Sequence, residues 1–153
     1  MRRLLLQTTI AGEPDDRNVG RFDRLRRFLS ELEDDSGQRV FEVTARDRVR
    51  RGEPDPVMSA LHRLDIDQLW LMAMDSGDGL TPEDCEAIGE FRRRGGGLLV
   101  ARDHMDLGSS ICGLAGVGAA HHFHSINQEP DTLRHCADDP FTPGISWPNY
   151  HSG

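Results

Sequence analysis

One segment, Gly95–Asp106, constrains the fold of this chain more than any other. It begins with three consecutive glycines, continues with the apolar run Leu98–Ala101, and ends in the polar sequence Arg-Asp-His-Met-Asp at residues 102–106. A short apolar run between breakers is typical of a strand buried on both faces, as in parallel α/β sheets. In such sheets, ligands bind outside the carboxyl ends of the strands. The segment therefore predicts an α/β fold and the position of a functional site.

The rest of the chain alternates predicted strands and helices. Strands are expected at Leu4–Ile10, Arg39–Thr44 (near a sheet edge), Gln68–Asp75, Leu98–Arg102 and His122–Ile126, and helices at Val19–Leu32, Val57–Leu64, Pro82–Arg94 and, as a short turn, Ile111–Ala115. The third helix has the clearest ends, with Thr81 as N-cap, Pro82 at the first position and Gly95 as the stop. This order predicts a three-layer αβα domain of the flavodoxin-like type, an open and mainly parallel sheet with helices on both faces.

Length and charge narrow the class of protein. A chain of 153 residues is expected to form one domain, residues 1–153. Its formal charge of −8, with no dominant basic face, argues against nucleic acid as a partner. No apolar run reaches the roughly 18 residues of a membrane-spanning helix, so no membrane partner is expected. The three cysteines, Cys85, Cys112 and Cys136, lack a C-x-x-C spacing, which favours a reduced, cytoplasmic protein.

All 18 basic residues are arginines, a bias typical of a GC-rich bacterial genome. The absence of lysine excludes Schiff-base chemistry and a P-loop lysine. The arginine runs at residues 46–51 and 92–94 are expected to be solvated faces or helix ends.

Residues 80–100 contain Leu-Thr-Pro-Glu-Asp, then Ala-Ile-Gly-Glu-Phe, then Gly-Gly-Gly-Leu-Leu-Val. This pattern resembles the helix-to-strand unit of the class I glutamine amidotransferase-like superfamily, and is most similar to the ThuA-like (trehalose-utilisation) proteins. Residues 116–125 and 138–146 resemble two further motifs of these proteins, with Asp139 where histidine is usual. The resemblance implies the superfamily fold and a protein that binds or modifies a small polar metabolite, such as a carbohydrate.

The chain departs from the superfamily at the nucleophile. Amidotransferases place a cysteine in a Gly-x-Cys-x-Gly elbow directly after this strand, whereas this chain has Arg102, Asp103 and His104 there, and Cys112 comes later. An intact glutaminase triad is therefore not expected, and whether the chain is an enzyme is left open. Because the family usually continues through another strand and helix, a C-terminal truncation is one interpretation.

His104 is the candidate general base, because it follows a strand end and is flanked by Asp103 and Asp106, which could orient it. Alternatively, the two aspartates cap the next helix. The predicted substrate-binding residues are Thr9, Asp75, Arg102, His122 and His124. Thr8 or Thr9, Asp75 or Ser76, and the pair Asp103 and His104 are expected to converge at one edge of the sheet, because parallel strands end on the same side.

No cofactor is predicted, and one alternative left open is that His104, His122 and His124 together bind a divalent metal. The alternative is that these imidazoles bond to loop backbone. Two other functions therefore stand beside a metabolite-binding protein: an inactive amidotransferase-like interaction or assembly module, and a metal-dependent hydrolase. The expected partner is a small-molecule ligand, and a homo-oligomer is left open.

Overall fold

A parallel sheet organises the described part of the chain. The computed structural model describes residues 1–12, 18–102 and 107–115. Its strands are β1 (Arg2–Ala11), β2 (Phe41–Arg48), β3 (Gln68–Ala73) and β4 (Gly97–Arg102). They lie in the order β2-β1-β3-β4, and every neighbouring pair is parallel.

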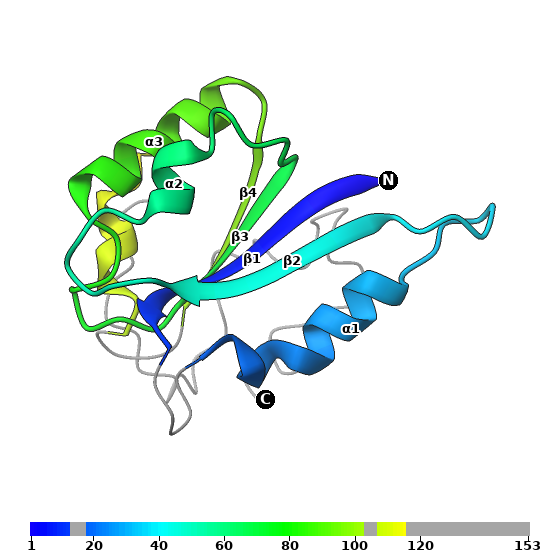
Figure 1. The fold of residues 1–153 in the computed structure, drawn as a ribbon, viewed down its shortest axis with the longest axis horizontal. Helices are drawn as coiled ribbons and strands as arrows, with labels where there is room; N and C mark the ends of the chain where they lie inside the picture. The colour runs from blue at the N-terminus through cyan, green and yellow to red at the C-terminus, as the bar shows by residue number, and fades with distance from the viewer. Residues whose placement is uncertain (13–17, 103–106, 116–153) are drawn as a thin grey trace, which may run out of the picture. The chain divides into compact units, whose positions relative to one another are not determined.

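Helices cover both faces of this sheet (Figure 1). The short 3-10 helix η1 (Val19–Phe22) and α1 (Asp23–Glu31) lie on one face, and α2 (Pro56–Ala60) and α3 (Pro82–Arg93) lie on the other. A second 3-10 helix, η2 (Ser109–Gly113), follows β4. The predicted three-layer, flavodoxin-like α/β fold is confirmed.

The described residues lie within one compact unit that extends to residue 121. The single domain predicted over residues 1–153 extends beyond them and stays a prediction.

Strand β1 is buried on both faces because it lies at the centre of the sheet. Its Leu5 belongs to the apolar core beneath α2 and α3, whereas Leu4 and Leu6 belong to the core beneath α1. All residues from Leu4 to Ile10 are buried. This confirms the first predicted strand.

Strand β4 is not buried on both faces, contrary to the prediction. It lies at the edge of the sheet among the described strands. Leu98 and Val100 pack against the core beneath α3, but Leu99 is 39% exposed and Ala101 is exposed too. The apolar run therefore predicted the strand correctly but not its burial on both faces, because burial depends on which other elements cover the strand.

Several boundaries differ from the prediction. The predicted helix from Val19 begins as η1 and becomes α-helical only at Asp23, and the turn expected at 111–115 is the 3-10 helix η2. Strand β2 continues to Arg48, beyond the predicted end at Thr44. Its last residue can be buried because the Arg48 guanidinium donates to the buried Asp84 carboxylate. The strand predicted at 122–126 lies outside the described residues.

The start of α3 is fixed by a reciprocal pair of hydrogen bonds. Thr81 Oγ1 accepts a hydrogen bond from the Asp84 backbone N–H (3.3 Å), and the Asp84 carboxylate accepts one from the Thr81 N–H (3.0 Å). This capping box satisfies two backbone donors that a helix start leaves open. The predicted cap at Thr81 and start at Pro82 are confirmed.

The end of α3 is a glycine-dependent turn that leads directly into β4. Gly95 adopts a φ of +95°, and the N–H groups of Gly95 and Gly96 donate to the carbonyls of Arg92 (2.9 Å) and Phe91 (3.1 Å). This is the bonding pattern of a Schellman motif, in which a left-handed residue closes the helix. The predicted stop at Gly95 is confirmed.

Replacement of two glycines in this region by alanine should change the stability of the protein in opposite directions. Gly95→Ala should lower the free energy of unfolding by roughly 1–2 kcal/mol, because an L side chain is strained at positive φ. Gly89→Ala, inside α3 with nothing within 4 Å of the added methyl group, should raise it by about 0.5–1 kcal/mol. Urea denaturation of both variants measures the difference. An equal effect of the two substitutions would contradict the assigned turn.

Candidate ligand site at the carboxyl edge of the sheet

The strand order reverses direction between β1 and β3. The chain leaves β1 through α1 towards β2 on one side, and leaves β3 through α3 towards β4 on the other. Open parallel sheets bind ligands outside the carboxyl ends of the strands, at such a switch point. The end of β1 and the loop that follows β3, residues 74–80, lie at this position.

Asp75 joins three separate segments there. Its Oδ2 accepts hydrogen bonds from Thr9 Oγ1 (2.6 Å) and Ser110 Oγ (2.7 Å). Its Oδ1 accepts from the backbone N–H groups of Gly77 (2.9 Å) and Ser110 (3.0 Å). The residue is only 1% exposed. The end of β1, the loop after β3 and helix η2 are therefore held together by one carboxylate.

The bonding of Asp75 favours its ionised form. Burial raises the pKa of this carboxyl, but the hydrogen bonds from Thr9, Ser110 and Gly77 together lower it by more, so the pKa lies below its ordinary value. A carboxylate has about four acceptor positions, and donors of the chain occupy that number here. This geometry gives Asp75 a positioning role, while the predicted contact of Thr9 and Asp75 with substrate stays untested.

Gly79 allows the loop after β3 to pass close over this carboxylate. A side chain at this position would collide with the Asp75 carboxylate and the Ser110 hydroxyl. The backbone N–H of Leu80, the next residue, donates to Ser110 Oγ at 2.9 Å. The glycine therefore lets the loop, Asp75 and η2 form one tightly packed corner.

A second polar contact positions the beginning of η1. Thr8 Oγ1 donates to Asp47 Oδ1 of β2 (2.7 Å), and the same oxygen accepts from the backbone N–H of Val19 (2.7 Å). This links the end of β1, the end of β2 and the first residue of η1. It thereby fixes the helical turn that carries Phe22.

A small apolar cavity lies at the carboxyl ends of β3 and β4. Its volume is about 240 Å³, and it is lined by Phe22, Met72, Ala73, Met74, Ala101 and Arg102. Met72 and Ala101 are register partners on the adjacent strands, so they form one wall. The Arg102 Nε–H donates to the Leu107 carbonyl (3.0 Å), which positions the guanidinium. Of the predicted site residues, Arg102 thus lines a cavity.

A buried ion pair on the α2/α3 face was missed by the sequence analysis. Arg48 donates to Asp84 Oδ2 (2.8 Å), and both side chains are fully buried. The same aspartate accepts from the Asp55 backbone N–H (2.8 Å). The interpretation of the run at 46–51 as a solvated face or helix end is therefore wrong for Arg48. No local sequence pattern marks this pair, because Arg48 and Asp84 lie 36 residues apart in the chain.

Arg46 forms a second ion pair beside the first. Its guanidinium donates to both carboxylate oxygens of Asp55, at 2.8 and 3.2 Å, and to Gln7 Oε1 at 2.6 Å. Burial raises the pKa of the Asp55 carboxyl, but Arg46 and the backbone N–H groups of Val49 and Val57 together lower it by more. The Gln7 Nε2 is buried and has no hydrogen-bond partner in the described part of the chain. By contrast, Arg92, Arg93 and Arg94 lie exposed at the end of α3, as predicted.

The remaining predicted site residues lie outside the described residues. These are His104 with Asp103 and Asp106, and His122 with His124. Within residues 1–12, 18–102 and 107–115, no group of three or more His, Cys, Asp or Glu side chains could hold a metal ion. The proposed histidine metal site therefore stays a prediction.

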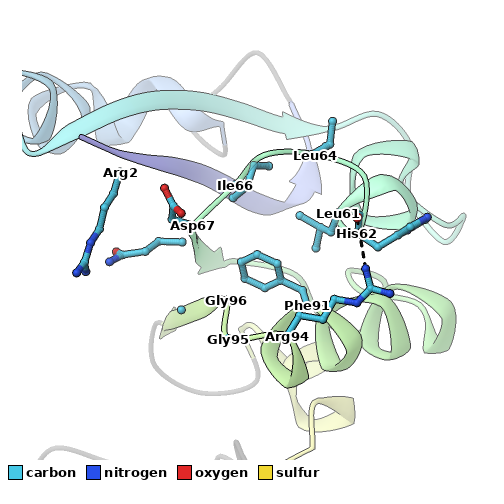
Figure 2. A pocket seen from close by; sticks show the side chains of 12 residues that line it. Arg2, Leu61, His62, Leu64, Ile66, Asp67, Phe91, Arg94, Gly95 and Gly96 are labelled. Atoms are coloured by element: carbon cyan, nitrogen blue, oxygen red, sulfur yellow. Dashed lines mark hydrogen bonds between the residues drawn. The ribbon is translucent and has the colours of Figure 1, made fainter.

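A larger cavity, of about 430 Å³, lies at the opposite edge, where the strands begin (Figure 2). Figure 2 shows the Phe91 ring above Gly96 and the Arg94 side chain reaching the loop before β3. Arg94 donates to Glu90 (2.9 Å) and to the His62 carbonyl (3.4 Å). These contacts close the end of α3 onto that loop. We assign this cavity a structural role, because parallel sheets bind ligands at the other edge.

Comparison with known proteins does not assign this chain to a family or a function. The chain matches no protein-family model, no curated protein and no solved structure. Among the described helices, none combines the length and apolar character needed to span a membrane. The resemblance to amidotransferase-like proteins therefore stays a hypothesis.

The Asp75 contacts predict a pH-dependent loss of stability in Asp75→Asn. The pKa of Asp75 is lower in the folded state than in the unfolded chain. The ionised carboxylate therefore contributes its full stabilisation of the fold above the unfolded pKa of about 3.9, and this stabilisation is lost as the pH falls through the folded-state pKa. At pH 7, the free energy of unfolding of the variant should be roughly 1–3 kcal/mol lower than that of the wild type. This difference should shrink below about pH 4. Chemical denaturation across pH 3–8 measures it.

Asp78→Asn is the matched control for this measurement. Asp78 lies in the same loop but is exposed, and its carboxylate makes a long surface contact with Arg51 (3.6 Å). Exposed pairs of this kind contribute little to stability. A penalty in Asp75→Asn that is independent of pH, or one matched by Asp78→Asn, would contradict the role of the buried carboxylate.

Proposed function

We propose that this chain binds a small metabolite in the cavity at the carboxyl ends of β3 and β4. The observation that carries this proposal is the position of the cavity. It opens at the edge where parallel α/β sheets bind ligands, and its walls come from η1, β3, the loop after β3 and β4. The Asp75 network beside it supplies the rigid support that a binding site needs.

The proposal does not include glutamine hydrolysis. Burial and the neighbouring Asp84 carboxylate raise the pKa of the Cys85 thiol, which is the opposite of what a nucleophile requires. Cys112 is exposed on η2 and comes after the position of the superfamily elbow. We therefore retain the amidotransferase-like hypothesis in one form, that of a ThuA-like protein without the glutaminase triad.

Proton transfer by His104 is a further part of the proposal. His104 follows the cavity-lining Arg102 by two positions, and Asp103 and Asp106 flank it in sequence. A base in this loop would serve a ligand bound at the same strand end. The carbohydrate class is supported by the family resemblance alone, since the cavity is lined mainly by apolar side chains.

An interaction or assembly module is the second candidate, and the surface of β4 favours it. Leu99 is 39% exposed on an edge strand of the described sheet. On the other face, a groove of about 770 Å³ runs between β4 and α3, with Leu98 and Val100 along it. Exposed apolar surface of this kind marks contact sites in many proteins.

Equilibrium dialysis against a defined mixture of sugars, nucleosides, amino acids and organic acids tests the binding proposal. Ala101→Phe should block the cavity, because Ala101 lines it from an exposed strand position where a phenyl ring can be accommodated. Leu99→Phe is the matched control, two residues earlier on the same face of β4 and outside the cavity lining. Mass spectrometry of the retained compounds provides the measurement.

The wild type and Leu99→Phe should retain at least one compound, and Ala101→Phe should bind it about tenfold more weakly, a loss of about 1.4 kcal/mol. Retention of nothing, or equal retention by all three proteins, would refute a ligand site in this cavity. Dimers in analytical ultracentrifugation that Leu99→Asp dissociates would then favour the assembly module.

A further inference from the structure

We propose that the solvent-facing side of α1 docks a second copy of this chain. In this dimer the two α1 helices lie antiparallel across a twofold axis, with Arg24 of each copy beside Glu31 of the partner subunit. This surface shares no residue with the lining of the proposed ligand cavity, so the dimer and the ligand site can be tested separately.

One side of α1 is already used for packing against the sheet (Figure 1). Leu29 is buried, and Phe22 and Leu25 pack with it against the apolar core that includes Leu4 and Leu6 of β1. Positions 22, 25 and 29 form one stripe, because residues three or four apart lie on the same face of a helix. A further contact of α1 must therefore use the opposite side.

The opposite side carries a second stripe, which is exposed and consists of Arg24, Arg27, Phe28 and Glu31. These residues have the spacing i, i+3, i+4 and i+7, so their side chains lie along one face of the helix. Phe28 is 61% exposed, and large aromatic rings are enriched where proteins contact one another. Because single exposed apolar residues are common on protein surfaces, the charges beside the ring must identify the occupant.

The charges at the two ends of this stripe oppose the helix dipole. Arg24 lies in the first turn of α1, where the partial charge is positive, and Glu31 is its last residue, where the partial charge is negative. In the part of the chain that the structure describes, neither side chain forms an ion pair or a hydrogen bond, whereas Arg26 and Arg27 both pair with Asp23. The two end charges therefore cost helix stability without any gain inside the described part of the subunit.

An antiparallel copy of α1 supplies a partner for each of these charges. Twofold symmetry repeats every contact, so a pair formed by residues i and j across the interface occurs twice. With the axis between positions 27 and 28, Arg24 faces Glu31 of the partner subunit and Arg27 faces Phe28 of the partner subunit. The second contact places a cation over an aromatic ring. Each end charge also lies beside the end of the partner helix that attracts it.

The order of charges along the stripe favours a second copy over a polyanion. A nucleic acid or an anionic membrane would be attracted by Arg24 and Arg27. It would be repelled by Glu31 and by the exposed acidic residues at positions 33–35. The partner that fits has an anion beside the start of α1 and a cation beside its end, which is the order that an antiparallel copy presents.

Charge exchange tests the proposal, with self-association measured by sedimentation velocity over a series of protein concentrations. The wild type should form dimers. Arg24→Glu and Glu31→Arg should each weaken the dimer by at least about tenfold, because each brings like charges together at two places in the interface. The double variant should recover the wild-type affinity. An equimolar mixture of the two single variants should form heterodimers, because both acidic positions of one chain then face basic positions of the other.

The substitutions themselves should not unfold α1. Glutamate in the first turn and arginine in the last turn both favour the helix dipole, so thermal unfolding should show no loss of stability in either single variant. Arg63→Glu is the matched control. Arg63 is exposed in the turn after α2, and its replacement changes the net charge as much as Arg24→Glu does. This variant should form dimers as the wild type does, whereas Phe28→Ala should weaken them.

A wild type that stays monomeric at every concentration overturns the proposal. So does a loss of association in the single variants that neither the double variant nor the mixture restores, or an equal loss in Arg63→Glu. Dimers that are unaffected by the changes in α1 but dissociate in Leu99→Asp would also overturn it, because they would assign the interface to β4.

Discussion

The arrangement of the carboxyl edge of this protein depends on the buried carboxylate of Asp75. A charged group that is almost completely removed from water is tolerated only where hydrogen bonds replace its hydration. Asp75 obtains these bonds from β1, from its own loop and from η2. The three segments must therefore adopt this arrangement together, since the loss of any one leaves the charge undersolvated. This requirement also positions Met74, which lines the proposed cavity, directly precedes Asp75 and donates its backbone N–H to Thr9.

On the face of the sheet covered by α2 and α3, two arginine–aspartate pairs link the helices to β2. Helix α2 has only five residues, too few to be stable in isolation. Asp55 caps its first turn through the N–H groups of Val57 and Met58, while Arg46 and the Asp84 carboxylate hold Asp55 itself. A short helix is thus maintained by polar contacts to β2 and α3 rather than by its own propensity.

Local patterns predicted the elements well, and tertiary contacts account for what they missed. The continuous apolar residues of β1 and β3 and the caps of α3 are properties of neighbouring residues, so they could be interpreted from the chain alone. The meeting of Thr9 and Asp75 followed from the parallel strands. The burial of Arg48, the exposure of Leu99 and the cavity formed by Phe22 with Met74 were not predictable, because each depends on segments distant in sequence.

The tight turn between α3 and β4 also determines which side chains face which layer. Helix α3 ends at Arg93, and β4 begins four residues later, directly after the two glycines that close the turn. Successive strand residues point to opposite faces. A single-residue insertion or deletion here would move Val100 to the cavity face and turn Ala101 towards the core. The length of this glycine turn, as much as its conformation, therefore sets the composition of both layers, and natural variation here should occur in steps of two residues.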